Sequence, residues 1–372
     1  MQNNIPIFLA SNDKYAPFVA TTIASVCYNT KSFCNFYVLD SGISNLNKRR
    51  IELLKEKFTN FSVEYLKIDL SNFGGFKSAD YISLDTYSRF FIPLLKPKLE
   101  KVIYMDVDMI ALGDIQDLYN TNLDDYVLGA VPEEFEYKNK CKLNNKLENS
   151  KDHKYFNAGL LLINVQKWNQ NDVTTKLLEV ERKHKDKLTF ADQCILNKYF
   201  NNNYKQLDVG FNIMIKYLQE HNFELPRNSV VRHFEGSLKP WLSNTDWEGY
   251  SISNFEDFWF FAKMTDFYEI LKFKYFSNLL ESKKEETIAN NNSEIPALPD
   301  NQEATVLASV LFNQKIKLKL FNTILLLKMI KKNNKTYYKL FGFIPLLKVI
   351  KKDNGAYYKL FGFIPLLKIK KA

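Results

Sequence analysis

The sequence predicts an α/β fold with a mostly parallel central sheet that is covered by helices. Three observations carry this prediction. Short apolar runs alternate with segments of helical spacing between Ile5 and Val165. The apolar runs are typical of buried strands. The 372 residues, 46% of them hydrophobic, suffice for one large domain plus an appendage.

The expected elements follow one another in a regular order. The first strand ends in a polar turn at Ser11–Lys14, and the early strands are separated by helices, as parallel neighbours require. No Gly-x-Gly-x-x-Gly follows the first strand, so the usual dinucleotide-binding fingerprint is absent. The expected strands are Ile5–Ala10, Phe36–Leu39, Val63–Ile68, Val102–Met105, Val127–Val131 and Leu160–Val165, and the expected helices are Pro17–Tyr28 and Asn45–Phe58.

Composition divides the chain into three parts. We predict a folded domain over 1–281, a flexible linker over 282–305 and a basic-aromatic repeat tail over 306–372. The linker contains two prolines and a run of three asparagines and is poor in large apolar residues. Lys315–Ala372 carries 15 lysines, no arginine and one acid, a net charge of +14; because the whole chain carries +9, the preceding residues carry −5.

The tail repeats one block of sequence. YYKLFGFIPLLK occurs at Tyr337–Lys348 and again at Tyr357–Lys368, a period of 20 residues. Its longest uncharged runs, such as Leu340–Leu347, have eight residues, whereas a transmembrane helix needs about 20. Apolar blocks flanked by lysines suit a peripheral anchor on an anionic membrane. The alternative is that they pack on the domain or on a partner chain. No nucleic-acid partner is expected, because the tail lacks arginine and its apolar blocks do not suit a phosphate backbone.

The cysteines and the first residues bear on the cellular compartment. Cys27, Cys34, Cys141 and Cys194 are scattered and lack the spacing of a metal site. We expect reduced thiols in a cytosolic setting. The first residues contain no basic segment followed by a long apolar stretch, so no signal peptide is expected.

The most informative motif is Asp106-Val107-Asp108. It follows the apolar run Val102–Met105, so both carboxylates are expected at the carboxyl end of a buried strand, where ligands bind in open α/β sheets. Two carboxylates separated by one residue are suited to hold a divalent cation. Such a cation clamps a diphosphate and neutralises its charge as it leaves. Alone the motif is weak, because Asp-x-Asp occurs by chance on many surfaces.

Other motifs occur in a fixed order with this one. The set is LASNDKY at Leu9–Tyr15, TYSR at Thr86–Arg89, YMDVD at Tyr104–Asp108, FNAG at Phe156–Gly159, ADQCILN at Ala191–Asn197 and HFEGSLKPW at His233–Trp241. With them, Met1 to about Leu280 resembles the family-8 retaining glycosyltransferases, especially the bacterial galactosyl- and glucosyltransferases that build lipopolysaccharide outer core. The resemblance implies a GT-A fold, a Rossmann-like nucleotide-sugar-binding domain with its donor site along the carboxyl edge of the sheet.

The resemblance implies a divalent metal bound by Asp106, Asp108 and His233. Imidazole is a better ligand for Mn²⁺ than for Mg²⁺, so Mn²⁺ is expected first and Mg²⁺ second. A histidine on its own is more often structural than metal-bound, and the rest of its motif favours the ligand role here. Lys239 would reach the diphosphate and stabilise the UDP leaving group. The substrate-binding residues that the resemblance implies include both aspartates, Val107 and Gly236.

On the nucleoside side, the resemblance implies that the turn after the first strand holds uridine. Backbone groups from Ala10 onward and the Asn12 side chain would meet the uracil edge, and Tyr15 would stack on the base. Family members often carry Asp where this chain has Asn12, and an amide still bonds the ring. Ser83 is expected to touch the nucleotide. Taken alone, Tyr15 is typical of an ordinary aromatic residue at a helix start.

On the sugar side, Arg89 and Asp192 would hold the donor sugar through its hydroxyl groups. Asn157 and Gly159 lie in Asn-Ala-Gly, where a glycine lets the backbone approach the sugar closely. Without the resemblance, the same tripeptide is typical of a turn before a strand. Glu133 is a further expected sugar contact, at a position where relatives often have Asp.

Gln193 bears on the mechanism. A double displacement needs a carboxylate nucleophile beside the anomeric carbon, and the matching residue here is an amide. The resemblance therefore implies same-face substitution, with Gln193 stabilising an oxocarbenium-like sugar through its carbonyl group. Asp192 is the alternative nucleophile. Tyr81 and Phe190 are expected to shape the acceptor pocket.

Together these features predict a metal-dependent retaining α-glycosyltransferase that moves galactose or glucose from a UDP-sugar to a saccharide hydroxyl on a growing lipooligosaccharide. The tail would hold it at the cytoplasmic face of the inner membrane, where a lipid-linked acceptor is presented. Two alternatives stay open. One is a transferase with a protein or another glycan as acceptor, and the other is a membrane-bound interaction protein with a degenerate sugar-nucleotide site.

Overall fold

The chain divides into a larger unit, Met1–Asn290, and a smaller unit, Asn291–Ala372. The computed structural model describes residues 4–67, 84–133, 143, 154–220, 224–226, 228–236, 239–242, 255–275, 327–332, 335–340, 344–352, 355–360 and 364–370.

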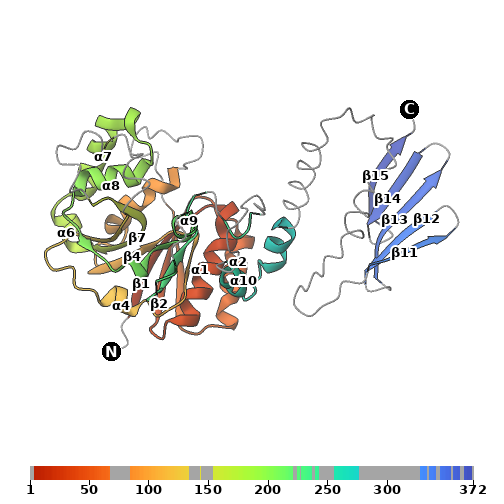
Figure 1. Ribbon diagram of the computed structural model, residues 1–372, viewed down its shortest axis with the longest axis horizontal. Coiled ribbons are helices and arrows are strands. Elements are labelled where there is room, and N and C mark those ends of the chain that lie inside the picture. Colours follow the sequence, from red (N-terminus) through yellow and green to blue (C-terminus); the bar gives the residue numbers. More distant parts are fainter. Residues whose placement is uncertain are drawn as a thin grey trace. The chain divides into compact units, whose positions relative to one another are not determined.

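The larger unit is built on a seven-stranded mixed sheet (Figure 1). The strand order is β3-β2-β1-β4-β7-β6-β8. Parallel pairs join β1 to β2 and β4, β2 to β3, and β6 to β8, whereas β7 runs antiparallel to β4 and β6. The predicted α/β fold with a mostly parallel sheet is therefore confirmed. The strands are β1 (Ile5–Ser11), β2 (Cys34–Asp40), β3 (Phe61–Lys67), β4 (Lys101–Met105), β6 (Leu128–Pro132), β7 (Phe156–Asn164) and β8 (Lys205–Gln206).

The largest departure from the predicted strands is at β7. It begins at Phe156 rather than Leu160, so Asn157-Ala158-Gly159 lies in a strand and not in a turn. The reason is that β7 has a partner on each side: Phe156 pairs with Pro132 of β6, and Leu160 pairs with Met105 of β4. Its reversed direction was not predicted either, because apolar runs do not record strand direction.

Helices cover both faces of the sheet, as Figure 1 shows. The side chains of β1 divide between two buried clusters, with Ile5, Ile7 and Leu9 in one and Phe8 in the other. This alternation follows from the two-residue period of a strand. On one face lie α1 (Ala16–Asn29), α2 (Asn45–Glu52) and α10 (Glu256–Ala262), and on the other lie α6 (Val165–Gln170), α7 (Val173–His184) and α8 (Ala191–Phe200).

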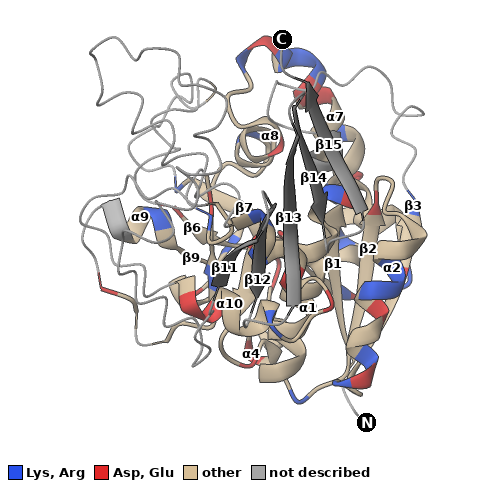
Figure 2. Cartoon of the chain, turned by 90° about the vertical axis from the view of Figure 1, so that its right-hand side faces the viewer, with Lys and Arg blue, Asp and Glu red and all other residues tan. Residues whose placement is uncertain are grey.

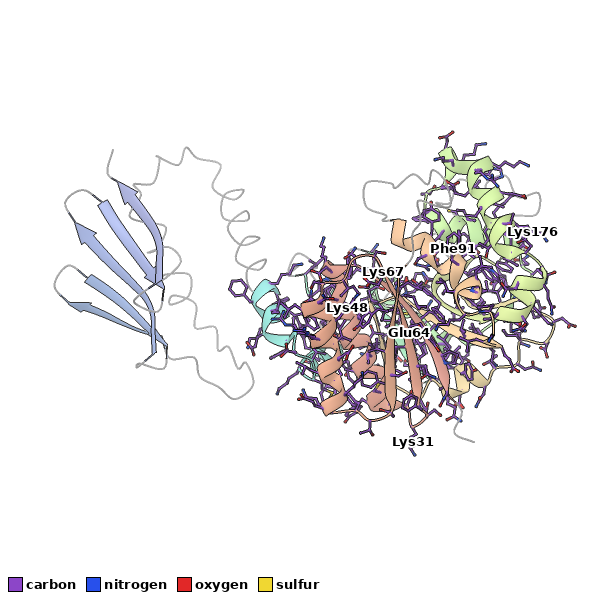
Figure 3. All side chains as sticks on the ribbon, turned by 180° about the vertical axis from the view of Figure 1, so that it is seen from behind. Lys31, Lys48, Glu64, Lys67, Phe91 and Lys176 are labelled. Atoms are coloured by element: carbon purple, nitrogen blue, oxygen red, sulfur yellow. The ribbon has the colours of Figure 1, made fainter. Side chains whose placement is uncertain are left out.

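The second predicted helix is shorter than expected. Ser44 caps it by accepting a hydrogen bond from the Asn47 backbone at 3.3 Å, and α2 gives way to a 3₁₀ turn, η2, at Leu53. Lys48, labelled in Figure 3, pairs with buried Asp40 at 2.5 Å and fastens α2 to the end of β2. The short helical elements are η1 (Asp13–Tyr15), η2 (Leu53–Glu56), η4 (Leu84–Phe91), α3 (Ile92–Leu95), α4 (Gln116–Asn120), η6 (Lys185–Lys187), η7 (Val209–Phe211) and α9 (Ile215–Glu220).

A second, three-stranded sheet completes the larger unit. It consists of β5 (Met109–Ala111), β10 (Val231–His233) and β9 (Ile213–Met214) in that order. Strand β10 is antiparallel to β5 and parallel to β9. Strand β5 begins directly after the Asp-Val-Asp motif. Because β10 pairs with β5, this sheet brings the residues around His233 close to the end of β4.

Charged residues of both signs lie on the outer helices of the larger unit. In Figure 2 acidic and basic residues occur together on α2 and α7, while β1 and β2 carry few charges. Charges of both signs are therefore interspersed along these two helices.

The described part of the smaller unit is an antiparallel sheet of five strands in chain order. The register repeats with the sequence: Tyr337 pairs with Lys348, and Tyr357 pairs with Lys368. Each copy of the block thus spans the end of one strand and the start of the next. No helix in the described ranges is long and apolar enough to cross a membrane. The strands are β11 (Leu327–Lys332), β12 (Lys335–Leu340), β13 (Ile344–Lys352), β14 (Gly355–Leu360) and β15 (Ile364–Lys370).

Candidate active site

Three potential metal ligands converge where the two sheets meet. Asp106 and Asp108 follow β4, and His233 ends β10. The pairing of His233 with Met109 and the bond from the Phe234 N–H to the Asp108 carbonyl at 2.9 Å place the imidazole beside the carboxylates. One ligand atom from each residue lies within 4.8 Å of the others. Two carboxylates and an imidazole nitrogen at this spacing fit a divalent cation.

Each carboxylate oxygen of Asp108 has a nitrogen neighbour, an imidazole on one side and an ammonium on the other. Oδ1 lies 3.2 Å from His233 Nε2, and Oδ2 accepts a hydrogen bond from Lys239 Nζ, which also donates to the Phe234 carbonyl. Burial opposes ionisation of Asp108, but the Lys239 ammonium and the His233 ring outweigh it and hold the pKa of Asp108 well below its ordinary value. Burial disfavours the imidazolium, yet Asp108 raises the pKa of His233. The site is thus built to hold positive charge.

Arg89 links this cluster to a second carboxylate. The buried guanidinium pairs with Asp106 Oδ1 at 3.1 Å and with Asp192 Oδ2 at 3.0 Å, and it donates to the Ala158 carbonyl. It stacks over the ring of Tyr104, 4.3 Å from the ring centroid. The planar fork of arginine can hold two carboxylates at fixed positions. Arg89 therefore fixes Asp192 relative to the candidate metal ligands.

Asp192 is a carboxylate of this site whose pKa lies near neutrality. It lies in the first turn of α8 and is buried. Burial raises the pKa of Asp192 to about 7, against the opposing effect of Arg89. Its carboxylate can accept hydrogen bonds from hydroxyl groups when it is ionised.

Gln193 is held by β7 and its flank. Its Oε1 accepts a hydrogen bond from the Ala158 N–H at 3.0 Å, and its Nε2 donates to the Tyr155 hydroxyl at 3.3 Å. A backbone N–H can only donate, so the orientation of this amide is determined. The carbonyl oxygen keeps one further lone pair for another partner.

Asn157 and Gly159 lie two residues apart in β7 and contact one another. Asn157 Oδ1 accepts from the Gly159 N–H at 2.9 Å and from Asn212 Nδ2 at 3.0 Å. A Cβ added at Gly159 would lie 2.5 Å from His233 Cε1 and 2.8 Å from Met109 Cε. The glycine is therefore required by the close approach of the His233 ring.

The turn expected to hold a nucleoside lies next to the cluster along the sheet. Leu9 pairs with Met105 in the β1–β4 register, so Ala10 comes beside Asp106. Asn12 accepts from the Lys14 N–H at 3.1 Å and caps η1. Tyr15 is 38% exposed and contacts the edge of Phe18. The described contacts include no direct bond from this turn to the three metal-ligand candidates.

The remaining predicted residues have different placements. Val107 and Glu133 are buried, and the Glu133 N–H donates to the Tyr155 carbonyl at 2.7 Å. Gly236 is exposed and has a φ of +63°, which favours glycine. Phe190 precedes α8, and its N–H donates to Cys194 Sγ at 3.3 Å. Ser83 and Tyr81 lie outside the described residues.

Three residues of the site were not predicted. Tyr104 donates to Asp106 Oδ1 at 2.6 Å, Tyr155 receives the Gln193 amide, and Asn212 Oδ1 faces His233 Nδ1 at 3.1 Å. Tyr104 belongs to the motif YMDVD and was open to prediction from it. Asn212 is a polar residue in an apolar stretch, which is a weaker signal.

The mixed sheet, with an Asp-x-Asp motif at the end of β4 facing a histidine from a second sheet, defines the class of nucleotide-sugar transferases with the GT-A fold. The chain belongs to glycosyl transferase family 8, whose model matches residues 6–245.

Named relatives agree with this family. A putative glycosyltransferase of Haemophilus influenzae is 33% identical over 243 residues, 63% of this chain and 72% of the relative. The lipopolysaccharide 1,3-galactosyltransferase of Salmonella typhimurium is 29% identical over 248 residues, 63% of this chain and 71% of that protein. The crystal structure of the galactosyltransferase LgtC with donor and acceptor sugar analogs has a TM-score of 0.61 and 27% identity, and covers 70% of this chain and 96% of LgtC.

Proposed function

We propose that the chain is a retaining α-glycosyltransferase that moves galactose or glucose from a UDP-sugar to a saccharide hydroxyl of lipooligosaccharide or lipopolysaccharide. The observation that carries the proposal is the cluster of Asp106, Asp108 and His233 beside the Arg89–Asp192 pair. The galactosyltransferase activities of two named relatives support the choice of substrates.

The three ligands would hold Mn²⁺, or Mg²⁺ as the second choice. The bound ion would neutralise the diphosphate and stabilise the UDP leaving group. Lys239, whose ammonium lies on Asp108, would supply a second positive charge to the same diphosphate. Arg89, Asp192 and the amide group of the Asn157 side chain would hold the sugar hydroxyls.

We favour same-face substitution over a double displacement. In this scheme the bond from the anomeric carbon to the diphosphate breaks, the leaving phosphate oxygen takes the acceptor hydroxyl proton, and the acceptor oxygen bonds the same face of the sugar. The transient positive charge on the sugar would be stabilised by Gln193 Oε1, which accepts one hydrogen bond from the Ala158 N–H and has a second lone pair. Asp192 is the alternative nucleophile, but its pairing with Arg89 suits it better to binding hydroxyls.

The test is release of UDP from UDP-galactose and UDP-glucose with Mn²⁺ and with a chelator. Mn²⁺-dependent turnover of one donor supports the proposal and identifies the sugar. If neither donor turns over, Mn²⁺-dependent UDP binding is measured next, because a transferase can show no turnover when its acceptor saccharide is absent from the assay. Absence of both turnover and UDP binding would favour an interaction protein with a degenerate site.

We also propose that the lysine-rich tail holds the enzyme at the cytoplasmic face of the inner membrane, near a lipid-linked acceptor. Its net charge of +14 over Lys315–Ala372 and its apolar blocks support an anionic surface as the partner. The full chain is expected to sediment with anionic vesicles and not with neutral ones, and to be released by high salt. Equal binding to both vesicle types would contradict this.

Donor affinity is expected to depend on pH through Asp192. Its pKa, raised to about 7 by burial, means that the carboxylate takes up a proton as pH falls through neutrality and loses charge for binding sugar hydroxyls. If only the ionised form binds, UDP-sugar affinity falls about tenfold between pH 8 and pH 6. Calorimetric titration measures this, and UDP without the sugar is the internal control. An equal pH effect on UDP would contradict the assignment.

Lys239→Met is expected to strengthen Mn²⁺ binding by the nucleotide-free protein, by about tenfold or more. The reason is that the Lys239 ammonium bonds the Asp108 oxygen and competes with the ion for it. UDP affinity should fall in the same variant, because the diphosphate loses a cation. Electron paramagnetic resonance of free Mn²⁺ measures the first effect. Lys167→Met, which removes a surface lysine paired with Asp125, is the control; unchanged Mn²⁺ affinity in Lys239→Met would refute the competition.

A further inference from the structure

Asn212 is a buried polar residue to which the proposed mechanism gives no role. It is 1% exposed and lies between η7 and β9. Its N–H donates to the Val209 carbonyl at 3.1 Å, and the next residue, Ile213, pairs with Arg232 of β10. The backbone therefore places Asn212 beside His233 independently of its side chain. That side chain contacts both Asn157 and His233.

Gly159, Asn157, Asn212 and His233 form a series of hydrogen bonds, and the first bond determines which atom donates in each of the others. The Gly159 backbone N–H can only donate, so the Asn157 atom that it meets at 2.9 Å is the oxygen. That oxygen also meets Asn212 at 3.0 Å, so the Asn212 atom there is the donor, Nδ2. The other end of the Asn212 amide, Oδ1, then faces His233 Nδ1 at 3.1 Å. An oxygen only accepts, so Nδ1 carries a hydrogen.

With the hydrogen on Nδ1, Nε2 is the ring nitrogen that can present a lone pair. Nε2 lies 3.2 Å from Asp108 Oδ1, within the ligand cluster. We propose that Asn212 is a positioning residue that keeps the proton of His233 on Nδ1 and so presents the Nε2 lone pair to a cation held by Asp106 and Asp108. The metal part of this inference rests on the proposed function, whereas the tautomer does not.

Replacement of the Asn212 side chain should change which nitrogen of the His233 ring carries the hydrogen. Without an acceptor at Nδ1, the neutral imidazole gains most by keeping its proton on Nε2, where Asp108 accepts it. A cation must then displace that proton. Removal of a partner that orients a metal-bound histidine costs roughly 10–100-fold in metal affinity, and we expect a loss in this range for Asn212→Leu.

The test is the tautomer of His233 in the metal-free full chain, read from long-range ¹H–¹⁵N correlations of the labelled rings. The spectrum is recorded over a series of rising pH, and the tautomer is read where the signal is that of the neutral ring. The chain has four histidines, and His233→Gln identifies the signal of interest by its loss. Wild type should show hydrogen on Nδ1. Hydrogen on Nε2 alone in wild type overturns the proposal, whether or not any variant folds.

Variants separate positioning from packing. Asn212→Leu should move the hydrogen to Nε2 and weaken Mn²⁺ binding, measured by paramagnetic resonance. Asn212→Asp keeps an acceptor for Nδ1–H and should keep the wild-type tautomer. Asn197→Leu is the matched control, because Asn197 is also fully buried but bonds the Phe156 backbone and not His233; it should leave the tautomer unchanged.

The outcomes distinguish this inference from the proposed function. If Asn212→Leu keeps hydrogen on Nδ1 and binds Mn²⁺ as wild type does, Asn212 does not position the ring. If the tautomers change as expected and no form of the protein binds Mn²⁺, the positioning holds and the metal-dependent function fails.

Discussion

Asp108→Ala is expected to lower kcat/KM for the sugar donor by on the order of 10³-fold or more. Asp108 supplies an oxygen to the candidate metal cluster and anchors both His233 and Lys239. The substitution therefore removes a ligand and releases the Lys239 ammonium and the His233 ring that Asp108 orders. Charge stabilisation by a bound metal amounts to several kcal/mol, and each 1.36 kcal/mol is a factor of ten in rate.

The measurement pairs turnover with metal binding. Mn²⁺ affinity, followed by paramagnetic resonance, should fall together with UDP release. Asp125→Ala is the matched control, because that carboxylate is fully solvent-exposed and pairs only with surface Lys167 among the described ion pairs. Asp108→Ala enzyme that keeps Mn²⁺-dependent turnover within a few-fold of wild type would remove Asp108 from the metal site.

Gly159→Ala is the second change with a large expected effect. The added methyl group would lie 2.5 Å from His233 Cε1 and 2.9 Å from Asn157 Oδ1, closer than atoms can approach. Both neighbours belong to the hydrogen-bond chain through Asn212, so we expect relief of the clash to displace the imidazole from its place beside Asp108. We expect Mn²⁺ affinity and turnover to fall by about 100-fold and the free energy of unfolding to drop by about 1–3 kcal/mol.

Gly129→Ala is the control that separates loss of stability from loss of Mn²⁺ affinity. Gly129 lies in β6, next to β7, and its added Cβ would meet Leu123 at 2.9 Å and Leu207 at 3.1 Å. These are flexible ends of apolar side chains away from the ligand cluster. Its denaturation midpoint should fall, whereas its Mn²⁺ affinity should match wild type. Equal loss of metal affinity in both variants would mean that the effect of Gly159→Ala is general destabilisation.

The sequence allowed prediction where the pattern is local. Apolar runs located the strands β1 to β4, and Asp106 and Asp108 had to follow β4 because the run before them ends at Met105. The return of His233 to these carboxylates is not local: the family resemblance carried by HFEGSLKPW implied it, and the β5–β10 pairing brings it there.

Properties that depend on distant partners could not be predicted. The direction of β7 is set by β4 and β6 on its two sides, and its own apolar run is compatible with either direction. The interpretation of Asn157-Ala158-Gly159 as a turn, which applied without the family resemblance, was wrong because these residues lie in β7, between β4 and β6. The amide orientation of Asn212 depends on a backbone N–H 53 residues earlier, at Gly159, which no local spacing reveals.

The separation of the ligands along the chain has a consequence for synthesis. Lys239 and Asp108 are 131 residues apart, and His233 reaches Asp108 only when β10 joins β5. A nascent chain that ends before β10 therefore has Asp108 at the end of β4 without its imidazole and ammonium partners, whereas Asp106 already has Arg89, and burial of the unpaired Asp108 charge is unfavourable. Synthesis must therefore reach Lys239 before Asp108 has both of its partners. Truncated products should accordingly be quality-control substrates without partial activity.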